Sequence, residues 1–223
     1  LPPLEVLYWQ FDLGIAGDLL AVVALVWILN LFNFMDGIDG IAGSQAGISS
    51  LIIGLLLVFE FNQQGLANLH WIMTVSALGF LLLNFPPAKI FMGDAGSGFL
   101  GLMLGALILL SAQVDQSLLW AWLIMLAVFV VDATFTLLRR LCRAEAIYQA
   151  HSSHAYQAAA RRYGSHLRVT TAVILINILW LAPIAYLVTI EKFSGLLGLI
   201  IAYLPLLLVA VYFGAGKTQL KSA

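Results

Sequence analysis

Seven long apolar runs follow one another along the chain and are separated by short polar segments. A transmembrane helix needs about 20 mostly apolar residues, and it satisfies its own backbone hydrogen bonds. The runs show no alternation with a period of two, which argues against a β-barrel. The pattern therefore predicts an all-α, polytopic transmembrane helical bundle of about seven spans. The expected spans are 19–32, 43–59, 69–83, 99–110, 118–138, 169–190 and 196–213.

The composition supports a membrane protein. Hydrophobic residues make up 62% of the 223 residues and charged residues 9%, against roughly 45–50% and about 25% in a typical soluble domain. We expect residues 1–223 to form a single transmembrane domain without a signal peptide, since no basic segment precedes a short apolar core. The net charge of −1 argues against a nucleic-acid partner. Because Cys142 is the only cysteine, an internal disulfide is excluded.

The basic residues predict the orientation, because cytoplasmic loops carry an excess of Lys and Arg. If the segment after the first span lies inside, nine of the ten basic residues are cytoplasmic and only Lys192 is outside. The nine are Lys89, Arg139, Arg140, Arg143, Arg161, Arg162, Arg168, Lys217 and Lys221. Three polar segments, 33–44, 84–98 and 139–168, then face the cytoplasm together.

The first two polar segments contain carboxylates among glycines. Asp36 and Asp39 lie three residues apart, on one side of the chain if it is helical there. Lys89 and Asp94 come just before a predicted helix, whose free N-terminal amides suit an anionic group. Structural readings stay open, since Asp36 and Asp39 can form a capped turn and Asp94 can cap the next helix.

Carboxylates this close to hydrocarbon are costly unless they are paired, hydrated or bound to a metal. Oxygen ligands without cysteine or paired histidine favour Mg²⁺ or Mn²⁺ over zinc, and Mg²⁺ usually brings substrate phosphates with it. Carboxylates, a lysine and a histidine at the mouth of a helical bundle are suited to phosphoryl transfer. The membrane setting indicates that one substrate is a lipid phosphate.

The third polar segment contains His151 and His154 among arginines. Their spacing of three could place two metal ligands on one helix face, but no third ligand lies within reach in the sequence. A histidine that meets a phosphate, with Arg161 adding positive charge, is the favoured reading. Asp132 lies within the fifth span, where a polar packing contact and a catalytic role are equally compatible with the sequence.

Two motifs carry a resemblance to a known family. Segment 33–40 reads Asn-Phe-Met-Asp-Gly-Ile-Asp-Gly, and segment 91–97 reads Phe-Met-Gly-Asp-Ala-Gly-Ser. In this order and separation they resemble the polyprenyl-phosphate N-acetylhexosamine-1-phosphate transferases, glycosyltransferase family 4. The resemblance implies Mg²⁺-dependent transfer of a sugar 1-phosphate from a UDP-N-acetylhexosamine to undecaprenyl phosphate, with release of UMP. It also implies a site on the cytoplasmic face of the bacterial inner membrane.

The resemblance assigns roles to individual residues. It makes Asp94 the principal Mg²⁺ ligand and stacks Phe91 on the uracil ring. The implied catalytic residues are Asp36, Asp39, Asp94 and His154, and the implied metal ligands are Asp94 and Asp36. The implied substrate-binding residues are Asn33, Gly37, Asn84, Lys89, Phe91, Gly93 and Arg161.

The chain departs from the family pattern in two places. Where many members have consecutive histidines, this chain has His154-Ala155-Tyr156-Gln157, which resembles the branch that initiates O-antigen chains. Members also carry an adjacent pair of aspartates on an earlier cytoplasmic loop, and this sequence has no Asp-Asp. We therefore expect that an N-terminal portion is absent, that the chain is about two-thirds of the enzyme, and that it is inactive alone.

Other classes of membrane protein remain as alternatives. A CDP-alcohol-type lipid phosphotransferase would share Asp36, Asp39 and Gly40, but it requires Ala and Arg where this chain has Gly43 and Ser44. Intramembrane aspartyl proteases need a glycine where Phe91 stands. An ion-coupled transporter would place its acids near the bilayer midplane.

Overall fold

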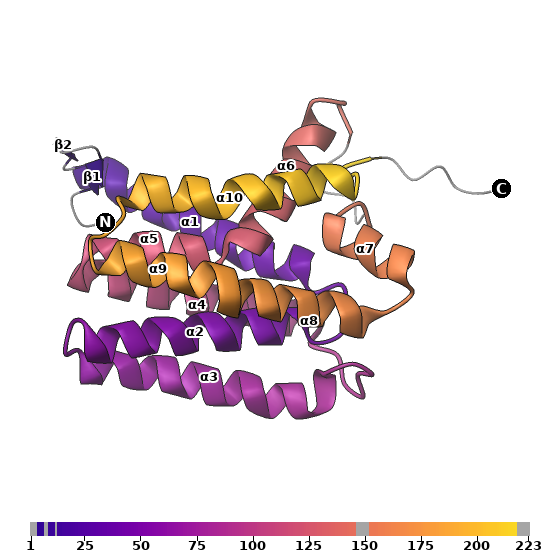
Figure 1. Ribbon diagram of the computed structural model, residues 1–223, viewed down its shortest axis with the longest axis horizontal. Coiled ribbons are helices and arrows are strands. Elements are labelled where there is room, and N and C mark those ends of the chain that lie inside the picture. The colour runs from indigo at the N-terminus through magenta and orange to yellow at the C-terminus, as the bar shows by residue number, and fades with distance from the viewer. Residues whose placement is uncertain (1–3, 7–8, 12, 146–151, 218–223) are drawn as a thin grey trace.

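The computed structural model describes residues 4–6, 9–11, 13–145 and 152–217, and the chain is all-α apart from one short hairpin (Figure 1). The hairpin pairs β1 (Leu4–Val6) with β2 (Trp9–Phe11) in an antiparallel manner. The helices before residue 146 are α1 (Gly14–Met35), α2 (Ile41–Phe59), α3 (Gln64–Asn84), α4 (Gly93–Val114), α5 (Gln116–Met125) and α6 (Ala127–Leu141). The helices after residue 151 are α7 (Ala155–Tyr163), α8 (His166–Ile176), the π-helical turn η1 (Asn177–Leu181), α9 (Ala182–Thr189) and α10 (Gly195–Tyr212).

The prediction of about seven spans is confirmed, and the chain is a multi-pass membrane protein. Six helices in the described residues are long and apolar enough to cross a membrane, and α8, η1 and α9 count as one of them. The run predicted at 118–138 is instead two helices, α5 and α6, bent by 68° at their junction. Taken as one broken span, this pair is the seventh.

The spans that look short in the sequence extend into the polar motifs. Helix α1 continues to Met35, and α4 begins at Gly93. The second motif was expected just before a helix, and that expectation is wrong, because Asp94, Gly96 and Ser97 lie within the first two turns of α4. The first two turns of a transmembrane helix therefore carry residues 93–97 of the motif.

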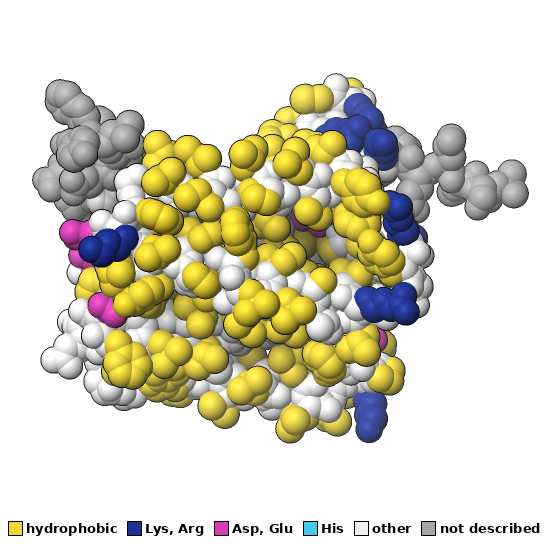
Figure 2. Space-filling view, in the orientation of Figure 1, with side chains coloured by type: hydrophobic (Ala, Val, Ile, Leu, Met, Phe, Trp, Pro, Cys, Tyr) yellow, Lys and Arg dark blue, Asp and Glu magenta, His cyan; other side chains and the backbone are white. Residues whose placement is uncertain are grey.

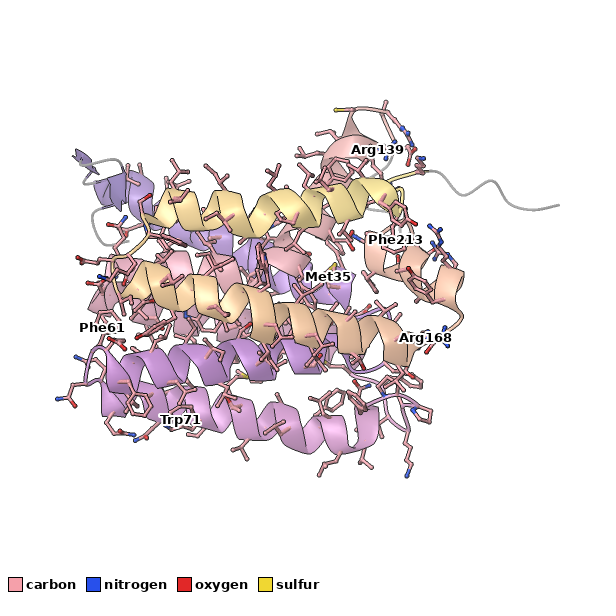
Figure 3. The ribbon with its side chains drawn as sticks, viewed as in Figure 1. Met35, Phe61, Trp71, Arg139, Arg168 and Phe213 are labelled. Atoms are coloured by element: carbon pink, nitrogen blue, oxygen red, sulfur yellow. The ribbon has the colours of Figure 1, made fainter. Side chains whose placement is uncertain are left out.

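The basic residues gather at one end of the bundle (Figure 2). This end, called the basic end below, holds the α1–α2 and α3–α4 loops, α7 and the start of α8. Arg139 and Arg168 lie there, while Phe61 lies at the opposite end (Figure 3). The turn between α9 and α10, which contains Lys192, also lies at the opposite end (Figure 1), as predicted. Lys221 lies outside the described residues.

Helix α2 is the most buried span, with 72% of its apolar window inside the bundle. It lies alongside α3 in Figure 1. Small residues allow this close approach, because apolar side chains gain nothing by leaving lipid for protein and helices instead associate through tight packing. The small buried residues of α2 are Ala42, Gly43, Ser44, Ala46, Gly47, Ser49, Ser50 and Gly54.

A buried polar cluster supplies a hydrogen-bond partner for the backbone at the junction of α5 and α6. Gln45 Nε2 donates to the Met125 carbonyl oxygen at 2.7 Å. Asn177, the first residue of η1, donates through Nδ2 to Gln45 Oε1 at 2.9 Å. Backbone groups freed inside a membrane must find partners within the protein. Gln45 and Asn177 are fully buried, so these amides supply partners that water cannot.

Among the glycines of the described residues, Gly101 in α4 has the closest backbone neighbours, and they belong to α1. A Cβ atom there would lie 2.7 Å from the Ile28 carbonyl oxygen and 2.8 Å from Leu29 Cα. Gly101→Ala should therefore destabilise the bundle by about 1–3 kcal/mol, the usual cost of overpacking. The fraction of protein that stays folded in detergent during a temperature ramp measures this effect.

Gly79→Ala in α3 is the matched control, because its added methyl would meet nothing within 4 Å. Alanine favours the helix over glycine by about 1 kcal/mol, so this variant should be as stable as the parent or slightly more so. Equal melting temperatures for the two variants would contradict the packing argument.

Candidate active site

The loop between α1 and α2 carries the first two aspartates and is shaped by Gly40. Helix α1 ends at Met35, and Asp36 is its C-terminal cap residue. Gly40 has φ +74°, a left-handed conformation that favours glycine. A Cβ at Gly40 would also lie 3.2 Å from Pro86 Cδ. The sequence can therefore turn from α1 into α2 in five residues while touching the α3–α4 loop.

Asn84 links the α1–α2 loop to the α3–α4 loop through two hydrogen bonds. Its Oδ1 accepts a hydrogen bond from Gly40 N at 3.0 Å, and its Nδ2 donates to the Ile90 carbonyl oxygen at 2.8 Å. Asp39 Oδ2 accepts another hydrogen bond between the loops, from Ala88 N at 3.1 Å. Two segments that lie about 50 residues apart thus form one unit at the basic end.

This unit surrounds a polar cavity of about 270 Å³, called the polar cavity below. Its lining comes from the end of α1, the α1–α2 loop, the end of α3, the α3–α4 loop, the start of α4 and the start of α8. The lining residues are Asn33, Asp36, Gly37, Ile38, Asp39, Asn84, Phe91, Met92, Gly93, Asp94, Ser97 and His166. Eight of the eleven residues predicted from the sequence therefore meet in one place.

Asp36 and Asp94 form the acidic part of the cavity. Burial, and then the charge of Asp94, raise the pKa of Asp36 from 3.8 to about 6. Asp94 is exposed in the first turn of α4. Asn33 connects α1 to this turn, since its Nδ2 donates to Ser97 Oγ at 3.3 Å. Two negatively charged carboxylates that repel each other in a partly buried cavity form a favourable environment for a cation.

The donor set fits Mg²⁺ when substrate oxygens complete it. Within the described residues, no three His, Cys, Asp or Glu side chains are grouped so that they could hold a metal ion. Asp36 and Asp94 offer only carboxylate oxygens, and Mg²⁺ is usually held by one or two carboxylates together with phosphates and water. The cavity therefore suits an ion that arrives with a phosphorylated substrate.

Phe91 stands at the edge of the cavity. Its side chain is 78% exposed, although it belongs to the lining. Gly93, two residues later, has φ +67° and turns the chain into α4. An exposed aromatic ring beside a polar cavity can stack on a planar base.

His166 also lines the cavity, and the sequence reasoning missed it. Its Nδ1 lies 3.2 Å from Asp39 Oδ1. Thr170, one turn later in α8, donates through Oγ1 to the Asp39 carbonyl oxygen at 2.7 Å. The available signal was Ser165-His166 at the start of an apolar run on the predicted inner side, because serine is a favoured helix N-cap.

Three predicted residues do not line the polar cavity. Lys89 is exposed, and its backbone N–H donates to the Leu83 carbonyl oxygen at 2.7 Å. Arg161 donates through Nη2 to the Ser152 carbonyl oxygen at 2.9 Å. His154 is 1% exposed and lies with its Nδ1 3.4 Å from Asp132 Oδ1. His151, its possible partner in a metal site, lies outside the described residues.

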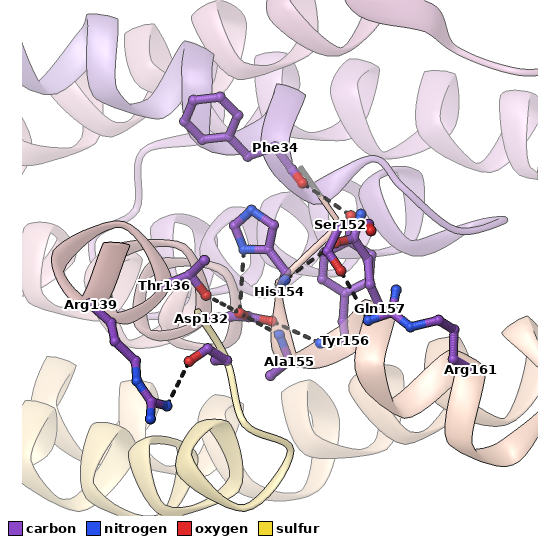
Figure 4. Close-up of polar contacts among 11 residues, drawn as sticks. Phe34, Asp132, Thr136, Arg139, Ser152, His154, Ala155, Tyr156, Gln157 and Arg161 are labelled. Carbon is purple, nitrogen blue, oxygen red and sulfur yellow. Dashed lines mark hydrogen bonds and ion pairs between the residues drawn. The ribbon is translucent and has the colours of Figure 1, made fainter. Parts of the chain in front are cut away.

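Asp132 has a structural role as the anchor of α7 (Figure 4). Its Oδ1 accepts a hydrogen bond from Ala155 N at 2.8 Å, and its Oδ2 accepts one from Tyr156 N at 2.9 Å. Thr136, one turn along α6, donates to Oδ1 at 3.2 Å. Free amides at a helix N-terminus need such acceptors, and a carboxylate also complements the helix dipole.

Helix α7, once anchored, braces the α1–α2 loop through Tyr156. The Tyr156 hydroxyl donates to the Phe34 carbonyl oxygen at 3.0 Å (Figure 4). A Cβ at Gly37 would collide with the same hydroxyl and with Gln157 Nε2. Burial raises the pKa of Tyr156, so its hydroxyl stays a hydrogen-bond donor. The His-Ala-Tyr-Gln segment therefore supports the loop that holds Asp36 and Asp39 from behind.

We expect Asp132→Ala to release α7 and the loop in front of it. Buried amides left without an acceptor cost about 1–3 kcal/mol each, so amide hydrogen exchange should speed up at Ala155 and Tyr156, and then in segment 34–40. Exchange followed by mass spectrometry measures this change. Asp115→Ala is the control, because Asp115 caps α5 at the opposite end through Ser117 N at 2.7 Å. Unchanged exchange in α7 would refute the anchor.

Comparison with known proteins places the two motifs in a family. Residues 3–112 match the description "Glycosyl transferase family 4", a range that includes Asp36, Asp39 and Asp94. A Bacillus subtilis protein described as a probable undecaprenyl-phosphate N-acetylglucosaminyl 1-phosphate transferase is 38% identical over 151 residues, 65% of this chain and 41% of the relative.

Two further relatives have other names. A decaprenyl-phosphate N-acetylglucosaminephosphotransferase of Mycolicibacterium smegmatis is 34% identical over 192 residues, 77% of this chain and 46% of its own length. A phospho-N-acetylmuramoyl-pentapeptide-transferase of Moorella thermoacetica is 38% identical over 103 residues, 46% of this chain and 32% of its own length. The chain thus spans less than half the length of these relatives. On the strength of the motifs, their convergence in one cavity and these matches, the chain belongs to glycosyl transferase family 4.

Proposed function

We propose that the protein transfers an N-acetylhexosamine 1-phosphate from a UDP-sugar to undecaprenyl phosphate, releases UMP and so initiates a lipid-linked glycan of the cell envelope. The proposal rests on one observation: Asp36 and Asp94, from separate motifs, line one polar cavity at the end of a membrane bundle. The names of the relatives support a polyprenyl phosphate acceptor and an N-acetylated sugar. The His-Ala-Tyr-Gln segment favours an O-antigen chain as the product.

The proposed location is the bacterial cytoplasmic membrane, with the cavity facing the cytoplasm. The grouping of Arg139, Arg168 and other basic residues at the cavity's end supports this orientation through the positive-inside rule (Figures 2 and 3). A nucleotide sugar is soluble and a polyprenyl phosphate is held in the bilayer. A cavity at the membrane surface is where both can meet.

The proposed reaction exchanges one phosphoanhydride bond for another. A phosphate oxygen of the lipid attacks the phosphorus attached to the sugar, the bond to the UMP oxygen breaks, and UMP leaves with that electron pair. Asp94 and Asp36 would hold Mg²⁺, with Mn²⁺ as a possible substitute, and the ion would supply neutralisation of charge on the diphosphate. Phe91 would stack on uracil, and Asn33 would bind the nucleotide beside Ser97.

Two alternatives fit the structure less well. In a CDP-alcohol phosphotransferase the residues at positions 43 and 44 would serve the site, but Gly43 faces Leu81 of α3 and Ser44 donates to the Ile41 carbonyl oxygen. A transporter would be expected to place carboxylates along a path through the bundle. Asp36, Asp39 and Asp94 instead lie together at one end.

Transfer of labelled sugar phosphate to undecaprenyl phosphate, in membranes containing the natural protein, tests the proposal. Asp94→Asn should reduce the rate by at least about 10²-fold, since a group that neutralises transition-state charge is worth at least about 2.7 kcal/mol. Asp115→Asn, the same change at the opposite end of α4, should leave the rate within about twofold of the parent, as expected for a surface site. Equal rates for the two variants would contradict the assignment of Asp94.

Removal of divalent cations is an independent test. Chelation with EDTA should abolish transfer, and Mg²⁺ or Mn²⁺ should restore it while Zn²⁺ should not, because the proposed ligands are carboxylate and phosphate oxygens. Full activity in the chelator would refute the metal assignment. A panel of UDP-sugars in the same assay identifies the donor.

A further inference from the structure

His166 gives the polar cavity a side chain that the two sequence motifs do not supply. The other polar lining side chains are three carboxylates, two amides and a hydroxyl, and His166 is the one lining residue among the described residues that can carry positive charge. It enters from the start of α8, about 70 residues after Asp94 in the sequence. A phosphorylated ligand beside these carboxylates needs a hydrogen-bond donor, and His166 is a lining side chain that can supply one.

Asp39 holds the His166 ring in one orientation. Both carboxylate oxygens of Asp39 are engaged, Oδ1 with His166 Nδ1 at 3.2 Å and Oδ2 with Ala88 N at 3.1 Å. Its carbonyl oxygen accepts from Thr170 Oγ1 at 2.7 Å. A carboxylate with both oxygens engaged, on a backbone that is itself held, is poorly placed to turn toward a metal ion, so Asp39 differs in role from Asp36 and Asp94.

This orientation makes Nε2 the reactive nitrogen of His166. The nitrogen that faces a carboxylate carries a proton, and when the ring is protonated Nε2 carries a second one, so Nε2 can donate to an anionic ligand. Among the described residues Nε2 has no hydrogen-bond partner, and the side chain is 46% exposed. Ser165 caps α8 by accepting from Arg168 N at 3.3 Å, so the helix N-terminus adds partial positive charge beside the ring.

We propose that the protonated His166 ring donates a hydrogen bond from Nε2 to a phosphoryl oxygen of the substrate in the polar cavity, and that Asp39 is the positioning residue for this contact. The inference rests on the proposed phosphoryl transfer. The phosphoryl oxygen can belong to the diphosphate of the nucleotide sugar or to the monophosphate of the lipid. The tests below separate these two sources.

Chemical labelling tests the contact without turnover. Diethyl pyrocarbonate modifies accessible histidines, and His70 and His154 are buried at 0% and 1% exposure, so His166 should react far faster than either. UDP with Mg²⁺ and a polyprenyl monophosphate serve as separate protecting ligands in the natural protein. At about ten times Kd a ligand that contacts Nε2 should slow labelling about tenfold, because the free fraction is 1/(1 + [L]/Kd).

Protection by UDP alone assigns the contact to the nucleotide diphosphate, and protection by the lipid phosphate alone assigns it to the acceptor. Protection by both means that the two phosphates share the position. Protection by neither overturns the inference. This readout needs no transfer, so failure of the proposed reaction and failure of the His166 contact can be told apart.

Two substitutions of His166 distinguish a direct contact with the substrate from a purely structural role. In His166→Asn the amide replaces Nδ1 and keeps the bond to Asp39, whereas in His166→Gln the amide reaches the position of Nε2. We expect His166→Asn to lose at least about tenfold in kcat/KM for the contacted substrate, as for a hydrogen bond to a charged group. His166→Gln should retain more activity than His166→Asn.

Leu167→Asn is the control, since Leu167 is the next residue, is exposed and does not line the cavity. It should keep activity within about twofold of the parent. If His166→Asn is as active as His166→Gln or more active, the ring acts only through Asp39 and the proposed contact is wrong. Loss of activity in Asp94→Asn together with unchanged activity in both His166 variants would leave the transferase proposal standing and remove this inference.

Discussion

Satisfaction of backbone hydrogen bonds in an apolar environment governs the structure. A segment in hydrocarbon has no water to complete its hydrogen bonds, so it must be helical or find partners in neighbouring helices. The α5–α6 break shows what an interruption requires, since the Met125 carbonyl meets Gln45, which is itself paired with Asn177. The loops of the polar cavity meet the same demand through Asn84 and Asp39, which accept backbone N–H groups.

The aspartates of the basic end divide into two kinds by their partners. Asp132 and Asp39 are engaged by backbone amides and fix the elements around them. Asp36 and Asp94 face the polar cavity, where burial and mutual repulsion raise the pKa of Asp36 to about 6. Carboxylates that accept backbone N–H groups stabilise the ends of helices and loops, whereas a carboxylate whose pKa is raised beside a second carboxylate in a cavity marks a candidate functional site.

Much of this architecture follows from the sequence. Continuous apolar runs predicted the spans, Lys and Arg predicted which loops share an end, and the motifs predicted most of the cavity lining. The α5–α6 bend could not be predicted, because no Pro or Gly marks it and its polar partner, Gln45, lies 80 residues away. His166 was missed for a similar reason, since a lone histidine gains meaning only from the neighbour that orients it.

The position of His154 shows how a motif can act on a site without entering it. Its ring lies beside Asp132 and stacks near Phe34, with centroids 6.4 Å apart, while the next residues carry Tyr156 to the back of the α1–α2 loop. A change in this segment would move Asp36 through Phe34 and Gly37, because packed elements transmit displacement. Loss of activity on mutation of His154 would therefore not make it a catalytic residue. Measuring the catalytic rate and the substrate affinity separately distinguishes a displaced carboxylate from a lost contact with the substrate.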